Sequence, residues 1–439
     1  MERVLRSTRF ASSIDAREKL VANLLGFLIG VGLPVAAAIL YPTYMHRMAD
    51  PFWEWTRLQE LPFVLAELCV ILWAMARGFR IGAVLARLDR NTTFALALFM
   101  VGLFASTLFV SKVPATSIVI SVSVVIHMLF GCAVFHLVDR RCERTPTVIA
   151  FWLGLGLMVL SALTAWRFLL PPPADQVLGG AIEWPSALPG FISVRHFGSW
   201  TGAIAALFAS HILTRRVQGR IDWHDGFFLL AIGMTIWSGT RAAILAIMFA
   251  CVIQLIAQRR LPSLHTVGRL SILTGAAASF AWLLIPYGDQ TFMLFGSAAE
   301  YSTVSFAASG RMELWAATFD RWTAAPLLGW GSGSTFWEVF IGWPHTQPHN
   351  FLLQFLISWG IVGAVGALWL LARLILQAHR SALASDAQLW PLLTCANSLI
   401  AMAGLEGMLH YPRFIMLIVA LLVIVIRLGP SGLPRTAEG

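Results

Sequence analysis

Long apolar segments separated by short polar loops occupy most of the 439-residue chain. The segments are roughly 17 to 25 residues long, which is about the length that a helix needs to cross a bilayer. Twelve spans are predicted, at 20–42, 60–76, 93–110, 115–138, 147–170, 198–214, 226–240, 241–258, 270–287, 350–372, 388–409 and 412–428. Uninterrupted apolar runs such as 414–426 argue against a transmembrane β-barrel, whose strands alternate apolar and polar residues over about ten positions. The pattern therefore predicts an all-α integral membrane protein with about twelve transmembrane helices.

The composition agrees with this prediction. Hydrophobic residues make up 58% of the chain and charged residues 12%, and the mean hydropathy is +0.75. A soluble domain cannot bury that much apolar surface. We find no internal repeat and no long polar linker, so residues 1–439 are expected to form a single membrane domain in contact with membrane lipids.

Positive charge is distributed unevenly between the two sets of loops. With the N-terminus placed in the cytoplasm, 22 of the 31 Lys and Arg residues fall on the cytoplasmic side. Cytoplasmic loops collect Lys and Arg, so the asymmetry supports an even number of spans with both termini cytoplasmic. The sequence pI near 9.9 follows from this loop rule, and nucleic acid is not an expected partner.

Two long loops lie on the predicted outer face, at 171–197 and 287–349. The second loop contains five of the eighteen tryptophans, which disordered segments avoid. A short helix is expected near 311–323, with Ser309 as its N-cap and Pro326 beyond its end. We expect this loop to lie back on the outer helix ends. Its tryptophans then either form part of the membrane-interface belt, which is the simpler interpretation, or stack on a sugar.

Arg241 lies where two predicted spans meet with almost no loop, directly after Ser238-Gly239-Thr240. Arginine at the membrane surface is costly unless it is paired or faces a wet cavity. A helix start with free N–H groups, together with a guanidinium, makes a phosphate site. Arg241 and the neighbouring Ser238 are therefore candidate substrate-binding residues, and an ion-paired structural arginine is an equal alternative.

Arg311 begins the expected loop helix on the same predicted face. A cation at a helix N-terminus opposes the helix dipole, so this position suits an anion shared with the protein. A single loop arginine is usually only solvated. Two arginines at helix starts on one face favour a common anionic ligand.

His345 and His349 precede the span at 350–372. No metal site is expected from them, because Pro348 interrupts the helical spacing and the glutamate of an HExxH motif is missing. His349 lies at the membrane face, where a neutral imidazole can accept a proton from a hydroxyl group or orient a phosphate. A helix-capping histidine is the alternative. Asn350 is a candidate substrate contact beside it.

Three further polar residues belong to the same outer face. Arg195 ends the first long loop and adds a third cation, while Glu406 and His410 lie between the last two spans. Glu406 is the outer carboxylate best suited to act as a partner or a base. The chain has no Walker A sequence, no GxGxxG after a strand and no GxSxG elbow, which argues against a nucleotide cofactor.

The segments 238–243, 309–311, 326–331, 349–354 and 359–363 occur in an order that resembles the O-antigen ligase and polymerase superfamily of membrane glycosyltransferases. These motifs cover roughly residues 235–365, and the first five spans resemble the family only in hydropathy and number. The sequence departs from the family pattern at Ala242, where many relatives have glycine.

The resemblance implies a class-C-like, metal-independent and cofactor-free glycosyltransferase of the bacterial inner membrane with a periplasmic active site. An O-antigen ligase transfers O-antigen polysaccharide from undecaprenyl pyrophosphate to lipid A–core oligosaccharide. The resemblance implies that Arg241 and Arg311 bind the pyrophosphate and that His349 is the base for the acceptor hydroxyl, with inversion at the anomeric carbon. It also implies that Arg195 holds a phosphate of the acceptor or the carrier.

Other functions stay open at this point. An O-antigen polymerase and a protein O-oligosaccharyltransferase share the same superfamily. A secondary transporter is a different class for which twelve spans are common, and Glu67, His127 and His136 offer a proton path unless they are satisfied inside the bundle. The gathering of informative residues on one face favours the enzyme.

Overall fold

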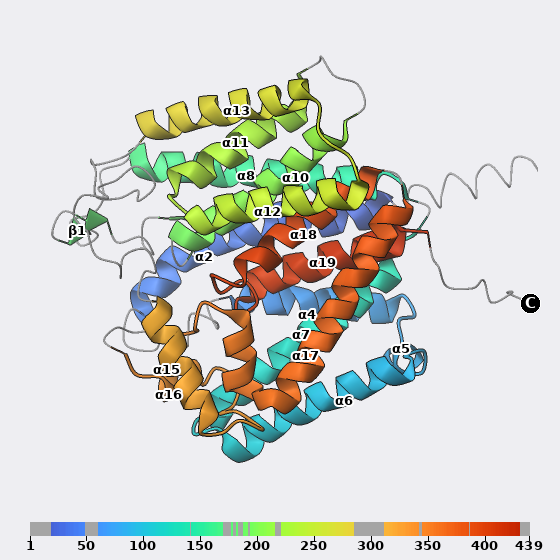
Figure 1. Ribbon diagram of the computed structural model, residues 1–439, viewed down its shortest axis with the longest axis vertical. Coiled ribbons are helices and arrows are strands. Elements are labelled where there is room, and N and C mark those ends of the chain that lie inside the picture. Colours follow the sequence, from blue (N-terminus) through green and yellow to red (C-terminus); the bar gives the residue numbers. More distant parts are fainter. Residues whose placement is uncertain are drawn as a thin grey trace, which may run out of the picture.

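The computed structural model describes residues 19–48, 60–140, 142–169, 177–178, 181–182, 188–191, 194–215, 221–284, 311–341, 345–385 and 387–430. These residues form a bundle of helices (Figure 1). The elements are η1 (Leu28–Gly32), α2 (Leu33–Met48), α4 (Leu61–Ala76), α5 (Ile81–Leu85), α6 (Arg90–Ala105), η2 (Ser106–Val110), α7 (Pro114–Leu137), α8 (Thr145–Leu169), β1 (Val177–Leu178), β2 (Ala181–Ile182), α10 (Val194–Thr214), α11 (Trp223–Trp237), α12 (Arg241–Gln258), α13 (Leu264–Leu283), α15 (Arg311–Thr323), α16 (Thr335–Glu338), α17 (Phe351–Ala384), η4 (Ala387–Leu389), α18 (Trp390–Met402) and α19 (Pro412–Leu428). Apart from the short antiparallel pair β1–β2, the described fold is helical, as the apolar pattern predicts.

Each of the twelve predicted spans overlaps a helix of the structure. Among the described residues, six helices are long and apolar enough to cross a membrane, as expected for a multi-pass membrane protein. They are Lys19–Leu40, Arg90–Val110, Pro114–Leu137, Thr145–Arg167, Arg241–Gln258 and Phe351–Ala384. The other helices are shorter or less apolar, so the count of twelve spans stays a prediction.

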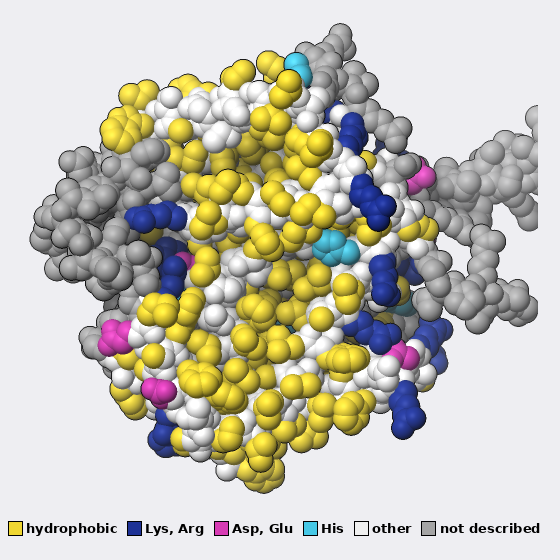
Figure 2. Space-filling view, in the orientation of Figure 1, with side chains coloured by type: hydrophobic (Ala, Val, Ile, Leu, Met, Phe, Trp, Pro, Cys, Tyr) yellow, Lys and Arg dark blue, Asp and Glu magenta, His cyan; other side chains and the backbone are white. Residues whose placement is uncertain are grey.

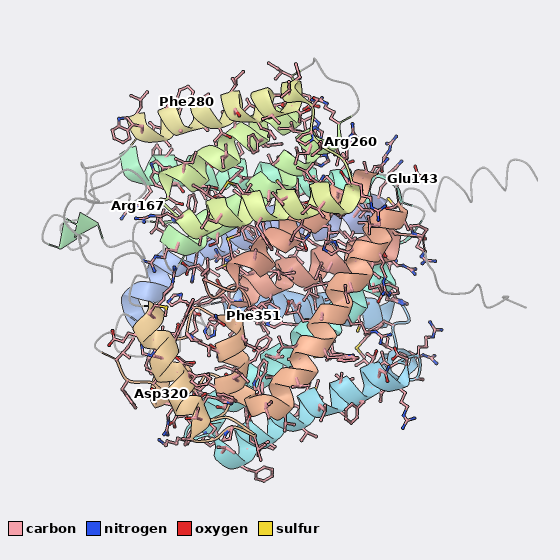
Figure 3. All side chains as sticks on the ribbon, viewed as in Figure 1. Glu143, Arg167, Arg260, Phe280, Asp320 and Phe351 are labelled. Atoms are coloured by element: carbon pink, nitrogen blue, oxygen red, sulfur yellow. The ribbon has the colours of Figure 1, made fainter. Side chains whose placement is uncertain are left out.

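The outer surface of the bundle is apolar between two charged ends. Large hydrophobic side chains such as Phe249 and Ile256 on α12 and Ile272 on α13 are more than half exposed. Figure 2 shows hydrophobic side chains over the middle of one face, with most Lys and Arg at its edges. Figure 3 places Arg260 and Glu143 at one end of the bundle and Arg167 and Asp320 at the other. Exposed apolar surface of this extent is what lipid-facing helices require.

The centre of the bundle consists of α10, α18 and α19, whose side chains are almost all buried. Helix α10 contacts α11, α12 and α18, while α19 contacts α7 and α18. Small residues allow these helices to approach closely: a Cβ added at Gly202 would lie 2.8 Å from Ala243 Cβ. Inside the bundle, His127 Nδ1 lies 2.5 Å from Glu67 Oε2. The pair satisfies one oxygen of Glu67, whereas Oε1 is buried with no hydrogen-bond partner among the described residues.

Helix α17 is interrupted at Gly360, and the segment 326–331 of the second long loop fills the break. Gly360 has φ 60° and ψ −170°, a conformation outside the helical region. The break frees backbone groups of α17, which pair with the loop instead. The hydrogen bonds run from Trp330 N–H to Ile357 O (2.7 Å), from Gly331 N–H to Ser358 O (3.0 Å), from Ile361 N–H to Pro326 O (2.8 Å) and from Val362 N–H to Leu327 O (3.3 Å). The loop is therefore fixed to the membrane helix by its main chain.

Replacing Gly360 with alanine is expected to destabilise this junction. A Cβ would lie 2.2 Å from Leu327 O, and a side chain in this conformation costs about 1–3 kcal/mol in addition. The melting temperature of the purified variant in detergent measures the loss. Gly275→Ala in α13 is the matched control, because no atom lies within 4 Å of its added Cβ. Equal melting temperatures for Gly360→Ala and the wild type would contradict the importance of the break.

Candidate functional site

His349 lies immediately before α17 in a turn that holds it in an unusual conformation. Its φ is 53°, in the left-handed region. Its backbone N–H donates to Gln347 Oε1 at 2.7 Å, and Asn350 Oδ1 accepts from Leu352 N–H and Leu353 N–H at 3.0 and 3.2 Å. Asn350 is thus the N-cap of α17. Capping α17 is a structural role. The expected contact of Asn350 with substrate stays a prediction.

Glu406 joins two of the candidate residues. It lies in the turn between α18 and α19, and its side chain is 2% exposed. Oε1 forms an ion pair with Arg311 Nη2, and Oε2 lies 3.1 Å from His349 Nδ1. Residues from three elements far apart in the sequence therefore meet at one carboxylate.

The surroundings of Glu406 keep it ionised. Burial alone would raise its pKa, but the hydrogen bond from His349 and the charges of His349, Arg311 and Arg195 lower the pKa to about 2. Because an ionised carboxylate only accepts hydrogen bonds, the bond to Glu406 requires a proton on His349 Nδ1. With that proton in place, Gln347 Nε2, which lies 3.0 Å away, cannot donate to the same nitrogen. In the neutral imidazole, Nε2 is then the nitrogen that can accept a proton.

The low pKa of Glu406 predicts a dependence of stability on pH. The folded-state pKa of about 2 lies below the ordinary value of 4.5, so this contribution is full above pH 4.5 and is lost as pH falls toward 2. Wild type is expected to lose more thermal stability than Glu406→Gln between about pH 6 and about pH 3. Melting temperatures at both pH values measure this difference. Parallel decreases in the two proteins would show that Glu406 is not held ionised by its neighbours.

Arg311 is the first residue of α15, whose range Arg311–Thr323 lies where a short loop helix is expected. Its side chain is 17% exposed, and its buried Nε has no hydrogen-bond partner among the described residues. Trp315, one turn further along α15, donates from Nε1 to Pro348 O at 2.8 Å. Helix α15 is therefore fixed directly to the His349 turn by Trp315, and Arg311 is linked to that turn through Glu406. Ser309, the expected N-cap, lies outside the described residues.

Arg241 is the exposed first residue of α12 and follows a tight turn. Ser238 is buried, and its hydroxyl donates to Thr235 O at 2.7 Å and lies 2.9 Å from Thr240 Oγ1. Ser238 therefore builds the turn that presents Arg241, and its expected substrate contact stays a prediction. A Cβ at Gly198 of α10 would lie 2.0 Å from Thr240 Oγ1, so the turn packs directly on the start of α10.

The start of α10 brings the remaining candidates to the same end. Arg195 is half-buried in its first turn, and its charge acts on Glu406. The next residue, His196, is buried with its ring centroid 4.2 Å from that of Tyr411. His410 is also buried, with its ring centroid 4.8 Å from that of Tyr411. His410 and Tyr411 follow Glu406 closely in the sequence, so the contact of His196 with Tyr411 packs the start of α10 against the turn that carries Glu406.

Sequence reasoning missed Gln347. This residue is 2% exposed; besides accepting from the His349 backbone, its Nε2 lies 3.0 Å from His349 Nδ1. Gly407 makes room for it, since a Cβ there would lie 2.7 Å from Gln347 Nε2. The only signal in the sequence was its place in the polar segment before α17. The structure assigns Gln347 to positioning the His349 turn.

A second ion cluster lies at the other end of α15. Glu338 is buried and accepts from Arg321 Nε at 2.8 Å, while Lys112 Nζ lies 3.0 Å from its Oε1. The Arg321 guanidinium lies 3.6 Å from the centroid of the Trp330 ring. The cluster ties the loop to the start of α7. The tryptophan stacks on a cation here, and the Nε1 atoms of Trp315, Trp322 and Trp330 bond backbone carbonyls.

The candidate site has no cluster of metal ligands among the residues that the structure describes. No group of three or more His, Cys, Asp or Glu side chains there is arranged to hold a metal ion. Arg311 and His349 meet at Glu406, and the charge of Arg195 acts on the same carboxylate. Arg241 is linked to this group through the packing of its turn on the start of α10. A guanidinium group beside an imidazole has the chemistry to bind a phosphate and to accept a proton.

Part of the chain matches a known protein family. Residues 226–368 match the model of a family described as O-antigen ligase. The matched range begins in α11 and ends in α17, so it contains Ser238, Arg241, Arg311 and His349 but not Glu406. No curated protein matches the chain.

Proposed function

We propose that the chain, which belongs to the O-antigen ligase family through its residues 226–368, is a membrane glycosyltransferase that acts as an O-antigen ligase. In this proposal it transfers O-antigen polysaccharide from undecaprenyl pyrophosphate to lipid A–core oligosaccharide. The observation that carries the proposal is the pairing of Glu406 with both Arg311 and His349. That contact holds a cation for a diphosphate and a base for a hydroxyl side by side.

The reaction follows from the chemistry of these groups. Arg241 and Arg311 bind the pyrophosphate of the donor, and Arg311 can do so while paired because a guanidinium has five N–H donors. His349 Nε2 accepts the proton of the acceptor hydroxyl as its oxygen attacks the anomeric carbon from the side opposite the diphosphate. The bond between that carbon and the diphosphate oxygen breaks, and its electron pair leaves with the diphosphate. The result is inversion at the anomeric carbon.

The arginines take the part that a metal ion often has in phosphate chemistry. Charge grows on the diphosphate as the sugar leaves, and fixed cations aimed at it stabilise the transition state. Glu406 offsets the charge of Arg311 in the resting protein and fixes the tautomer of His349. Arg195 lies near enough to affect Glu406 and is proposed to bind a phosphate of the acceptor or the carrier. Ser238, Asn350 and His410 complete the proposed substrate-binding side.

The proposed location is the periplasmic face of the bacterial inner membrane, with twelve spans and both termini in the cytoplasm. The end of the bundle with the starts of α10, α12 and α17 would then face the periplasm, together with the loops 171–197 and 287–349. The charge rule for loops supports this orientation. The exposed apolar side chains between the two ends would contact membrane lipids.

The experiment that tests the function is an acceptor assay with purified protein. Undecaprenyl-pyrophosphate-linked O-antigen is supplied with lipid A–core, with carrier-linked repeat units, or with an acceptor protein, each alone. The proposal expects glycosylation of lipid A–core. Glycosylation of the repeat units only would indicate a polymerase, glycosylation of the protein only would indicate a protein O-oligosaccharyltransferase, and either result would replace the ligase assignment.

The same assay tests the use of arginines in place of a metal ion. Transfer is expected to continue at its full rate after the protein and substrates are treated with EDTA. A transfer rate that falls to background in EDTA and returns on addition of Mg²⁺ or Mn²⁺ would contradict the arginine mechanism.

A further inference from the structure

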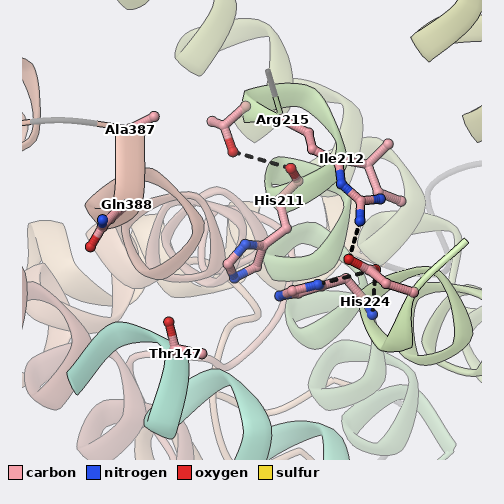
Figure 4. Close-up of a pocket in the computed structure, with 9 residues that line it drawn as sticks. Thr147, His211, Ile212, Arg215, His224, Ala387 and Gln388 are labelled. Carbon is pink, nitrogen blue, oxygen red and sulfur yellow. Dashed lines mark hydrogen bonds and ion pairs between the residues drawn. The ribbon is translucent and has the colours of Figure 1, made fainter. Parts of the chain in front are cut away.

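A separate pocket lies at the other end of α10 from the candidate site. Helix α10 begins beside Arg195 and ends at Thr214, and its 21 residues span about 30 Å at 1.5 Å per residue. The pocket is lined by the end of α10, the start of α11 and parts of α8 and η4, and its volume is about 220 Å³. Figure 4 shows polar side chains from these elements around it, among them Thr147, His211 and His224. The proposed transfer reaction uses none of them.

Two histidines face each other in this pocket. The ring centroids of His211 in α10 and His224 in α11 lie 4.3 Å apart, and Figure 4 shows the two rings side by side. The Nε2 atoms of both residues are buried and have no hydrogen-bond partner among the described residues. A buried polar atom without a partner is costly, so a ligand that uses both nitrogen atoms would recover this cost.

The tautomer of His224 follows from its neighbour. Its Nδ1 lies 3.2 Å from Asp222 Oδ1. The Asp222 carboxylate forms an ion pair with Arg215, and an ionised carboxylate only accepts hydrogen bonds. Nδ1 therefore carries the proton of the neutral ring, and Nε2 has a free lone pair. A histidine whose second nitrogen donates to a carboxylate is the usual arrangement of a metal ligand.

The charges around the pocket do not exclude a cation. Arg215 pairs with Asp222 and Asp225, and Arg269 pairs with Asp225. Two carboxylates therefore balance two guanidinium groups beside the histidines. The ring of Trp223 stacks on that of His224 with centroids 3.7 Å apart, which limits the motion of the imidazole.

We infer that His211 and His224 form a binding site for a divalent transition-metal ion at the end of the bundle opposite the candidate active site. Two neutral imidazoles favour Zn²⁺, Ni²⁺, Cu²⁺ and Co²⁺, whereas Mg²⁺ and Ca²⁺ prefer oxygen ligands. Water completes the coordination, and Thr147 and Gln388 lie in the pocket wall with oxygen atoms as possible further ligands. The site is separate from the proposed transfer reaction, which needs no metal ion.

Metal binding to the purified full-length protein tests this inference independently of transfer activity. The protein is used in detergent, stripped with EDTA and freed of any affinity tag, and Zn²⁺ binding is measured by calorimetry. Wild type is expected to bind Zn²⁺ at a site that His211→Asn and His224→Asn each weaken by about 10-fold or more, because even the loss of an outer-shell partner has an effect of that size. The visible absorption of bound Co²⁺ is expected to decrease in parallel.

The control is His265→Asn, which changes an exposed histidine in α13 and is expected to bind Zn²⁺ like wild type. Size-exclusion profiles of all variants report whether they fold. Unchanged Zn²⁺ affinity in folded His211→Asn or His224→Asn, or Mg²⁺ that competes equally with Zn²⁺, would overturn the inference.

Discussion

Arg311→Ala is expected to reduce the rate of glycan transfer by about 100-fold or more, the effect of removing one fixed donor that stabilises growing negative charge. Arg241→Ala is expected to have an effect of the same order, because both guanidinium groups are proposed to bind the leaving diphosphate. Initial rates with purified protein, lipid-linked O-antigen and lipid A–core measure both losses. The matched control is Arg260→Ala, which removes an exposed arginine near the other end of α12.

The ion pair with Glu406 requires a second variant of Arg311. Removing the guanidinium leaves a buried carboxylate with fewer partners, so a loss of activity in Arg311→Ala can reflect folding. Arg311→Lys keeps a charge for Glu406 but lacks the planar fork that binds phosphate oxygens in pairs. It is expected to accumulate like wild type and to stay impaired in transfer. Wild-type rates in Arg311→Lys and Arg241→Lys would show that positive charge alone is sufficient.

His349→Asn is expected to reduce transfer by about 100- to 10,000-fold, the range for loss of a general base. Asparagine is chosen because it tolerates the left-handed backbone conformation that His349 adopts better than most residues do. The turn is therefore kept while the imidazole is removed. Initial rates of transfer are compared with those of His265→Asn as the control. Full activity in His349→Asn would exclude this histidine as the base.

The helices could be predicted from the sequence because each apolar run is about as long as a membrane-spanning helix. The ends of the helices could be predicted less well. Hydropathy ends the tenth span at residue 372, whereas α17 continues to Ala384. Arg373, at which the apolar run stops, lies inside the helix and pairs with Asp89. An ion pair between residues so distant in sequence leaves no signal in a local pattern.

The break in α17 is a second feature that depends on contacts between residues distant in the sequence. Gly360 belongs to a recognisable motif, but its neighbours are helix-forming apolar residues. The groups that satisfy the broken helix come from the segment 326–331, about thirty residues earlier. The two motifs could be found separately from the sequence, yet only the fold shows that one is the backbone partner of the other.

Most residues of the candidate site could be predicted from the sequence, but the contacts among them could not. Arg311 and His349 were identified because each lies at a helix start on one predicted face, and Glu406 because it lies in the outer turn between the last two spans, where it is suited to act as a partner or a base. Sequence spacing does not reveal that Glu406 binds both of the others. Gln347 was missed because a glutamine in a loop has no pattern that distinguishes a positioning residue from a solvated one.

The proposed mechanism depends most on the presence of Arg241 and Arg311 at the periplasmic face. Single cysteines at positions 241 and 311, introduced into a variant without the native cysteines, are labelled in cells with a maleimide that does not cross the inner membrane. The account predicts that both react from the periplasm, whereas Arg260→Cys reacts only after the inner membrane is opened. Reaction of positions 241 and 311 only after opening, with Arg260→Cys labelled from outside, would contradict it.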